Sequence, residues 1–176
     1  MTASPDQPPR EESYTVLPRL YDRFVALRKS DYSIWLNHVD GLASERHLGR
    51  RVLSLAAGTG ECEIELAHRG FEVTCTDLST AMLATAQEKL AQAQDPPAGM
   101  RFLQMDMRDI PAGEPYDLVL CHYYALNYLV TVEDVRRCFA SARRLGIVLT
   151  TSSCASLISV TFCARSSCPA SPPSSP

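Results

Sequence analysis

The expected fold rests on Val52-Leu53-Ser54-Leu55-Ala56-Ala57-Gly58-Thr59-Gly60, a short apolar run that stops at a pair of glycines. Such a run, followed by residues at helical spacing, is typical of a strand buried on both faces of a parallel sheet. We expect this strand to cover 51–57 and the next helix to cover 61–69. Gly58 and Gly60 remove side chains where backbone must approach a ligand closely, although a plain strand-to-helix turn would also use them.

The same alternation of strand and helix patterns continues to position 151. We expect strands at 71–76, 101–105, 116–121 and 146–151, and helices at 80–93 and 132–145 with Ser79 and Thr131 as caps. Upstream, helical spacing between positions 14 and 42 predicts two N-terminal helices, the second capped by Ser30 or Asp31. Strands that alternate with helices form right-handed βαβ units. The predicted fold is therefore α/β, with a doubly wound, Rossmann-like parallel sheet.

Composition narrows the class of protein. The chain has 176 residues and a net charge of −3 without a basic block, which argues against a nucleic-acid partner. It has no apolar run near the roughly 20 residues of a membrane helix, so we expect no membrane partner. The polar start at 1–13 lacks a signal core and predicts a disordered leader in a cytoplasmic protein. Seven cysteines without C-x-x-C spacing indicate buried thiols rather than a metal site.

A change in composition near Gly146 divides the chain. The last 31 residues hold nine Ser, three Cys and four Pro but a single charged residue, Arg165. Such a segment is a poor former of capped helices. We therefore expect one domain over 14–151, and a disordered tail over 152–176.

Two carboxylates follow strands of the predicted sheet. Asp77 ends the second strand, 17 residues after Gly60, where its oxygens can accept from both hydroxyls of a ribose. Asp106 ends the third strand, where it can accept from an adenine amino group, and the Met107 amide can donate to a ring nitrogen. Both positions also suit ordinary turn chemistry. Together they predict an adenosine site.

The helix after the glycines distinguishes between adenosine cofactors. A dinucleotide places its pyrophosphate on a helix N-terminus and usually needs a third glycine three residues after the second. That position holds Glu63, with Glu61 and Glu65 beside it. Three carboxylates would repel a pyrophosphate but would tolerate a sulfonium. The sequence therefore favours S-adenosylmethionine over a nicotinamide cofactor.

Three stretches also resemble class I S-adenosylmethionine-dependent methyltransferases, in particular a bacterial small single-domain subgroup. They are residues 52–60, residues 71–79 with Met82-Leu83, and residues 116–121 with Leu126-Asn127-Tyr128-Leu129. The subgroup's Tyr-Asp pair and Trp helix are matched by Tyr21-Asp22 and Trp35. The resemblance covers about positions 14–145 and implies methyl transfer from S-adenosylmethionine to a small-molecule acceptor.

The resemblance assigns roles to particular residues. It implies that the cofactor-binding residues are Ala57, Gly58 and Gly60 at the methionine part, Asp77 and Leu78 at the ribose, Asp106 and Met107 at the adenine, Cys121 beside the methyl group, and Tyr21 and Trp35 over the pocket. His122, at the same strand end, is the candidate catalytic base, because its unperturbed pKa is about 6.5. Alternatively it is a non-catalytic histidine. Tyr123 and Tyr124 either line the acceptor pocket or pack in the core.

Three features depart from the family, one of which is Tyr124, where the subgroup often has Asp. An acidic residue that helps to hold the cofactor's ammonium usually stands where Ser54 stands, so weaker cofactor binding is expected. After Leu145 the family's remaining strands have no counterpart, so a truncated or frame-shifted C-terminus is expected. Two alternatives therefore stay open, an inactive cofactor-binding remnant and, less favoured, a nicotinamide-binding oxidoreductase. The sequence leaves the acceptor and the oligomeric state open.

Overall fold

A computed structural model of the chain describes residues 21–22 and 29–150. Its elements, in chain order, are α2 (Lys29–Glu45), β1 (Arg51–Ser54), α3 (Glu61–His68), β2 (Glu72–Asp77), α4 (Thr80–Gln92), β3 (Met100–Gln104), β4 (Leu118–Cys121), the 3-10 helix η2 (Tyr123–Tyr128), α5 (Val132–Leu145) and β5 (Ile147–Thr150). The expected leader (1–13), the expected tail (152–176) and most of the first expected N-terminal helix lie outside the described residues.

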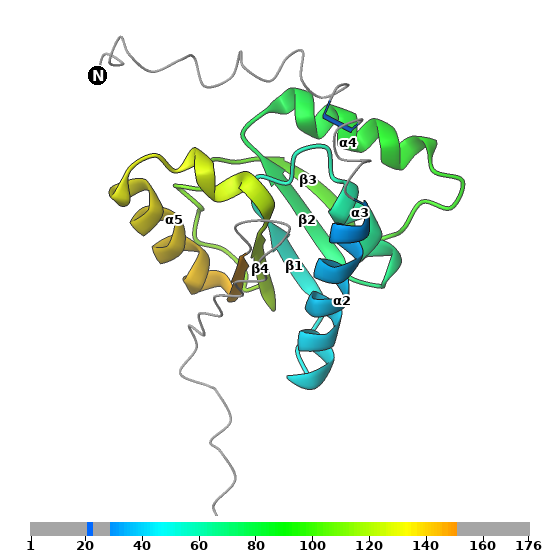
Figure 1. The fold of residues 1–176 in the computed structure, drawn as a ribbon, viewed down its shortest axis with the longest axis horizontal. Helices are drawn as coiled ribbons and strands as arrows, with labels where there is room; N and C mark the ends of the chain where they lie inside the picture. The colour runs from blue at the N-terminus through cyan, green and yellow to red at the C-terminus, as the bar shows by residue number, and fades with distance from the viewer. Residues whose placement is uncertain (1–20, 23–28, 151–176) are drawn as a thin grey trace, which may run out of the picture.

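The strands form one parallel sheet in the order β3-β2-β1-β4-β5. From β1 the chain builds outward to β3, and it then returns to place β4 on the other side of β1 (Figure 1). The direction of winding therefore reverses between β1 and β4. In sheets of this kind the crevice beyond the carboxyl ends of the strands at the reversal is the usual ligand site.

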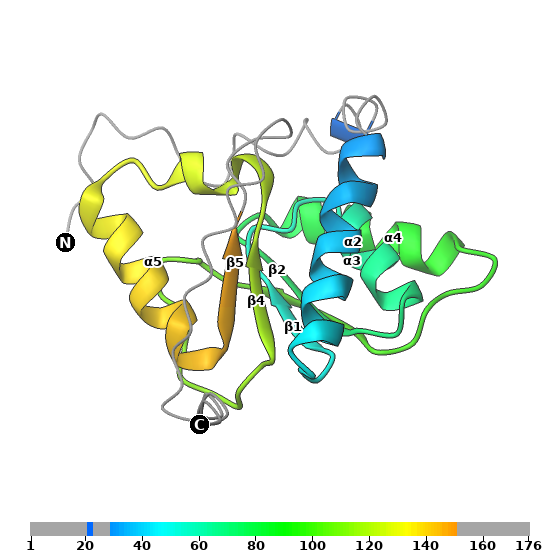
Figure 2. The same cartoon turned by 60° about the horizontal axis from the view of Figure 1, so that its bottom comes forward.

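Helices cover both faces of the sheet. In Figures 1 and 2, α2, α3 and α4 lie on one face and α5 lies on the other. Alternate residues of the central strands enter the two cores: Val52 and Leu120 pack toward α2 and α3, whereas Leu53 and Val119 pack toward α5. This pattern follows from the period of two in a strand, and it confirms the doubly wound α/β prediction.

The predicted caps Ser79 and Thr131 are confirmed, whereas the predicted cap of the second N-terminal helix and the predicted end of the first strand are wrong. Met82 N–H donates to Ser79 Oγ over 3.3 Å, and Asp134 N–H donates to Thr131 Oγ1 over 3.0 Å. The second N-terminal helix begins at Lys29, so neither Ser30 nor Asp31 precedes it as a cap. The first strand ends at Ser54 rather than at position 57. Extended backbone cannot continue through Ala56, whose φ is 50°.

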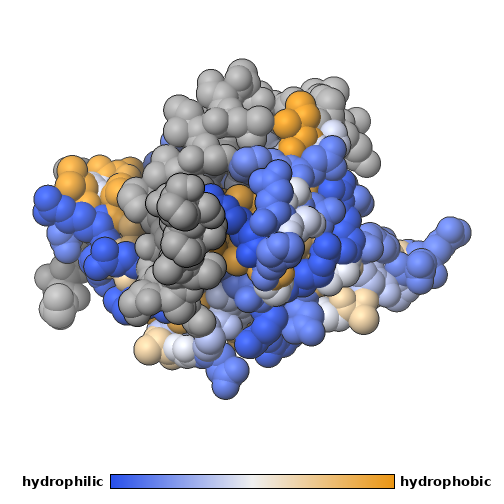
Figure 3. Space-filling model, turned by 90° about the horizontal axis from the view of Figure 1, so that it is seen from below, coloured by the Kyte–Doolittle hydropathy of each residue, from blue (hydrophilic) through white to orange (hydrophobic). Residues whose placement is uncertain are grey.

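One face of the described surface is mainly polar. Figure 3 shows one face on which hydrophilic colour predominates between the grey atoms, and hydrophobic colour lies in separate patches. Among the described helices, none is long and apolar enough to cross a membrane. The four described cysteines are buried free thiols, as expected for small apolar core residues.

Candidate functional site

The glycine loop turns sharply between β1 and α3. Ala56, Gly58 and Gly60 all have left-handed backbone, with φ of 50°, 61° and 70°. A Cβ at Gly60 would also lie 2.9 Å from the Cβ of Ala86, which is closer than real Cβ contacts allow. Glycine is therefore required there both for the turn and for the approach of α4. The loop holds the start of α3 against the sheet.

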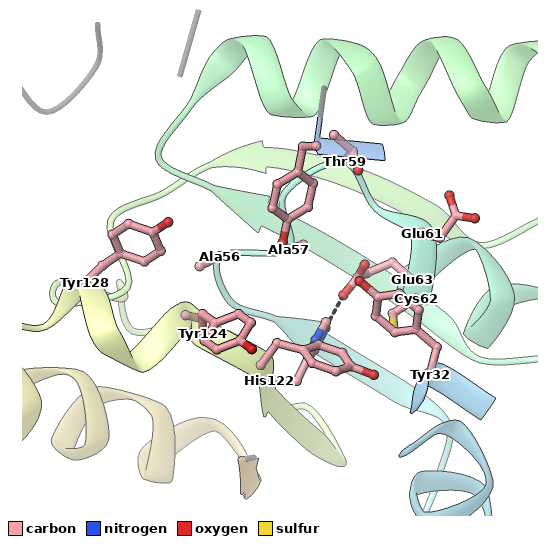
Figure 4. A pocket seen from close by; sticks show the side chains of 13 residues that line it. Tyr32, Ala56, Ala57, Thr59, Glu61, Cys62, Glu63, His122, Tyr124 and Tyr128 are labelled. Atoms are coloured by element: carbon pink, nitrogen blue, oxygen red, sulfur yellow. Dashed lines mark hydrogen bonds and ion pairs between the residues drawn. The ribbon is translucent and has the colours of Figure 1, made fainter. Parts of the chain in front are cut away.

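A cavity of about 200 Å³ lies beside this loop, where β1 and β4 end. It is lined by Tyr21, Tyr32, Ala56, Ala57, Thr59, Glu61, Cys62, Glu63, His122, Tyr123, Tyr124, Ala125 and Tyr128. In Figure 4, Tyr32 stands on one side and Tyr124 and Tyr128 on the other, with Glu63 and His122 between them. Tyr123, like Ala56, is a non-glycine residue with positive φ, at 58°. Backbone strain of this kind is concentrated at functional sites.

A buried carboxylate connects the three elements around the cavity. Glu63 Oε1 accepts a hydrogen bond from Ser54 Oγ over 2.6 Å and lies 2.8 Å from His122 Nε2. Glu63 is fully buried, and its second oxygen, Oε2, has no hydrogen-bond partner among the described residues. The α3 side chain thus joins the end of β1 to the end of β4 and keeps one oxygen uncommitted.

The environment of Glu63 favours its ionised form. Burial by itself would raise the pKa of this carboxyl. The charge of His122 and the hydrogen bonds from His122 and Ser54 together outweigh burial, so the pKa of Glu63 lies below its ordinary value. An ionised carboxylate accepts hydrogen bonds and cannot donate them. Ser54 and His122 must therefore be the donors.

Asp77, at the end of β2, faces the glycine loop. Gly58 N–H donates to Asp77 Oδ2 over 2.8 Å, and Ser79 N–H donates to Oδ1 over 2.9 Å. A carboxylate has about four acceptor positions, so about two remain for an external donor pair such as a diol. Burial, partly opposed by the two amide hydrogen bonds, raises the pKa of Asp77 above its ordinary value of 3.8. Leu78, the next residue, is exposed beside it.

The end of β3 carries a pairing that the sequence analysis did not anticipate. Arg108 Nε lies 2.9 and 3.0 Å from the two carboxylate oxygens of Asp106, and Arg108 Nη2 also contacts this carboxylate. The guanidinium further reaches Asp134 in α5, over 3.6 Å. Asp106 is thus neutralised by a bidentate arginine rather than left free. The neighbouring Met107 is buried in the core under η2 and α5.

Of the expected site residues, Tyr21, Ala57 and His122 line this cavity. The others do not, and two of them, Trp35 and Cys121, are buried in the cores. Trp35, on α2, is 2% exposed and packs in the core, with its ring centroid 6.1 Å from that of His122. Cys121 is buried on the α5 side of the sheet. Neighbouring residues of a strand point to opposite faces, so Cys121 points away from the cavity that His122 faces. Both residues support the site from the core.

Tyr21 reaches the site through its neighbour Asp22. Asp22 Oδ1 accepts from Thr59 Oγ1 and from Lys89 Nζ, each over 2.6 Å, and Lys89 also lies 3.1 Å from Glu61. These contacts fix Tyr21 over the loop, where its Cε1 would lie 3.6 Å from a Cβ at Gly58. The structure thus brings Tyr21, Ala57, Gly58 and His122 together.

Sequence reasoning missed Glu63, Tyr32 and Tyr128 as site residues. Glu63 was considered only as a charge that would repel a pyrophosphate. A signal was nevertheless present, because Glu63 precedes the buried Leu66 and Ala67 by three and four residues. That spacing places it on the buried face of the helix. A carboxylate at such a position is a candidate for a functional role.

Comparisons with known proteins identify the family. A family model described as a methyltransferase domain matches residues 52–146. The candidate methyltransferase YqeM of Bacillus subtilis (strain 168) is 38% identical over 77% of this chain and 53% of its own length. Glycine N-methyltransferase of Rattus norvegicus is 35% identical over 58% of this chain and 36% of its own length.

Solved structures of methyltransferases are also similar to this chain. The amino pentose methyltransferase CalS10 of Micromonospora echinaspora, solved with bound S-adenosylmethionine, has a TM-score of 0.64 and 27% identity over 76% of this chain and 56% of its own. The chain spans about half the length of the curated relatives that it matches, 53% and 47% for the first two.

Proposed function

Because the chain belongs to the class I S-adenosylmethionine-dependent methyltransferases, we propose that it binds S-adenosylmethionine beside the glycine loop and transfers a methyl group to a small-molecule acceptor. One observation carries this proposal. The hydrogen bond from Gly58 N–H to Asp77 Oδ2 sets a ribose-type carboxylate against a glycine loop, where the winding of the sheet reverses.

The residues present fit this cofactor. The negative charge at the start of α3 suits a cationic group and opposes a pyrophosphate. We assign Ala57, Gly58 and Gly60 to the amino-acid end, Asp77 and Leu78 to the ribose, and Asp106 and Met107 to the adenine. For Asp106, the pairing with Arg108 leaves less acceptor capacity, so the backbone of Met107 takes the larger part.

The protein's own contribution is positioning. When bound, the cofactor supplies a methyl carbon that its sulfonium has already activated. Tyr21, Tyr124 and Tyr128 bound the cavity, so they orient an acceptor and exclude water. His122 is the proposed base for acceptors that must lose a proton. Its Nε2 contacts Glu63, so in the neutral ring Nδ1, which is buried without a hydrogen-bond partner in the described residues, is the atom left to receive the proton.

Calorimetric titration of the chain with S-adenosylhomocysteine and with a nicotinamide dinucleotide tests the cofactor. We expect heat with the first and none with the second. Binding of the dinucleotide alone would contradict the proposal and favour an oxidoreductase.

Turnover with labelled S-adenosylmethionine and a panel of small amines, alcohols and thiols tests the acceptor class, and a transfer RNA arm tests the expectation that nucleic acid is not the acceptor. Cofactor binding without turnover on any acceptor would favour the inactive remnant.

A further inference from the structure

Glu63 is a buried carboxylate that the proposed reaction does not yet use. Its Oε1 already accepts two contacts, from Ser54 at 2.6 Å and from His122 at 2.8 Å. Its Oε2 is buried with no hydrogen-bond partner in the described residues, although Glu63 lines the cavity. Figure 4 shows the carboxylate directed from α3 toward His122, across the middle of the cavity. A buried charged oxygen without a donor is costly, so a ligand with N–H groups would relieve that cost.

The charges around the cavity select the sign of such a ligand. Glu61 and Glu63 both line it, and no lysine or arginine is among its described lining residues. Lys89, the nearby ammonium, is held by Asp22 and Glu61. Burial, and to a smaller extent neighbouring groups that include Glu63 and Asp77, raise the pKa of Tyr21 to about 12, so Tyr21 adds no negative charge of its own near pH 7. A cation is favoured here and an anion is opposed.

The aromatic rings select the same kind of ligand. Tyr32 and Tyr123 meet edge to face with ring centroids 4.6 Å apart, and Tyr21, Tyr124 and Tyr128 complete the lining. Tyrosine faces attract ammonium groups through the ring quadrupole. A carboxylate surrounded by tyrosines therefore matches an alkylammonium better than a metal ion, for which no cluster of three or more ligating side chains exists in the described residues.

We propose that Glu63 Oε2 is the binding group for an alkylammonium, with Ser54 and His122 as positioning residues that hold its other oxygen. The inference rests on the proposed function, which supplies two sources of this chemistry. One is the ammonium of the cofactor's amino-acid part and the other is an amine acceptor in its protonated form. Family members usually carry a negative charge at the position of Ser54, and weaker cofactor binding was expected from its loss. Glu63 of α3, whose Oε1 lies 2.6 Å from Ser54 Oγ, supplies that charge instead. Weaker cofactor binding is therefore no longer expected.

The experiment compares two ligands that differ in the amino-acid part. S-adenosylhomocysteine carries the ammonium, whereas 5′-methylthioadenosine has the same adenosine and thioether but no amino acid. Calorimetry measures both on the full chain, on Glu63→Gln and on Glu63→Asp. Glu65→Gln is the matched control, since Glu65 is a carboxylate of the same helix that does not line the cavity and is paired with Arg69.

If the cofactor is the source, Glu63→Gln weakens S-adenosylhomocysteine about 10- to 100-fold, the effect of losing a hydrogen bond to a charged group. Binding of 5′-methylthioadenosine stays within about twofold, which also shows that the adenosine site is folded. Glu63→Asp retains part of the preference, and Glu65→Gln retains all of it. The readout is the ratio of the two affinities, so a general loss of folding does not imitate the result.

If the ammonium belongs to the acceptor, Glu63→Gln leaves the ratio of the two nucleoside affinities unchanged. Methylammonium is then the probe. Titrated into the S-adenosylhomocysteine complex and followed by NMR, it binds the wild-type chain and fails to bind Glu63→Gln. If the wild-type chain binds both nucleosides, but Glu63→Gln changes neither the ratio of their affinities nor the binding of methylammonium, this inference is wrong and the proposed function stands. Failure of the wild-type chain to bind either nucleoside overturns the proposed function and this inference with it.

Discussion

At the scale of single residues, the charge state of each carboxyl in the site depends on the hydrogen-bond partners that its oxygens already have. Glu63 and Asp77 are both buried carboxylates, yet their pKa values move in opposite directions. Asp77 accepts from two amides, which do not outweigh its burial. Glu63 has His122 as an additional partner, whose charge and hydrogen bond reverse the effect of burial. Burial thus sets the direction of the pKa shift at Asp77, and the additional partner reverses it at Glu63.

The first prediction concerns the tautomer of His122. An ionised Glu63 can only accept, so Nε2 of His122 must carry a proton, and whenever the ring is neutral the lone pair must be on Nδ1. Nitrogen NMR of histidine-labelled protein distinguishes the two tautomers, and His122→Gln assigns the signal among the four histidines. We expect the Nε2–H form in the wild-type chain and a loss of that preference in Glu63→Gln. A dominant Nδ1–H form in the wild-type chain would be inconsistent with this pairing.

The second prediction concerns pH and the ribose carboxylate. The ionised form of Asp77 accepts from a diol, and its pKa in the folded chain is raised. Binding of 5′-methylthioadenosine should therefore be full above that pKa and should weaken as the pH falls through it, at a higher pH than for an ordinary aspartate. Calorimetry across the acidic range measures this. Asp77→Asn should bind more weakly and without this pH dependence; the same slope in the variant would remove Asp77 from the ribose site.

At the scale of elements, the glycine loop and the helix caps are the devices that set the positions of α3 and α4. Gly60 combines a φ of 70° with the close approach of Ala86, so it ties the start of α3 to the middle of α4. Ser79 and Thr131 begin α4 and α5 by accepting amide hydrogen bonds. These contacts place the loop, Asp77 and the first turn of α3 in one fixed arrangement.

The third prediction compares two glycines in these elements. Gly60→Ala should destabilise the fold by about 2–4 kcal/mol, from a left-handed non-glycine residue and an overpacked contact. Gly41→Ala should stabilise it by about 0.5–1 kcal/mol, because Gly41 lies inside α2 and a Cβ there meets nothing within 4 Å. Urea denaturation of both variants gives the free energies of unfolding. Equal effects of the two substitutions would contradict this account of the loop.

At the scale of the whole molecule, the site is assembled from distant parts of the chain. The loop follows β1, Asp77 ends β2, His122 follows β4, and Tyr21 is brought in by Asp22, which Lys89 of α4 holds. A ligand in this crevice contacts several elements at once and binds the folded state alone. Its binding energy therefore adds to the stability of the domain.

The fourth prediction follows from this linkage. S-adenosylhomocysteine at 100 times its Kd should raise the free energy of unfolding of the full chain by about 2.7 kcal/mol. Urea denaturation with and without the ligand measures the shift, and a nicotinamide dinucleotide at the same concentration is the control. An equal shift with the dinucleotide would point to a different cofactor.

Most of the fold was predictable because its signals are local. The apolar run before Gly58, the caps Ser79 and Thr131 and the helix at 132–145 are set by neighbouring residues. The 3-10 helix at Tyr123–Tyr128 was missed, since no periodic pattern marks so short an element. The strand end at Ser54 was also misplaced, because the turn at Ala56 depends on tertiary contacts rather than on the apolar run.

The sequence by itself determined the α/β class, the glycine loop and the carboxylate at the end of β2, because periodicity and turn chemistry act over a few residues. Only the tertiary structure decided the partners: Glu63 with Ser54 and His122, Asp106 with Arg108, and Trp35 in the core. Glu63 and His122 are 59 residues apart, and they meet because β4 packs beside β1. Strand order and register depend on burial across the whole sheet, and no local pattern records them.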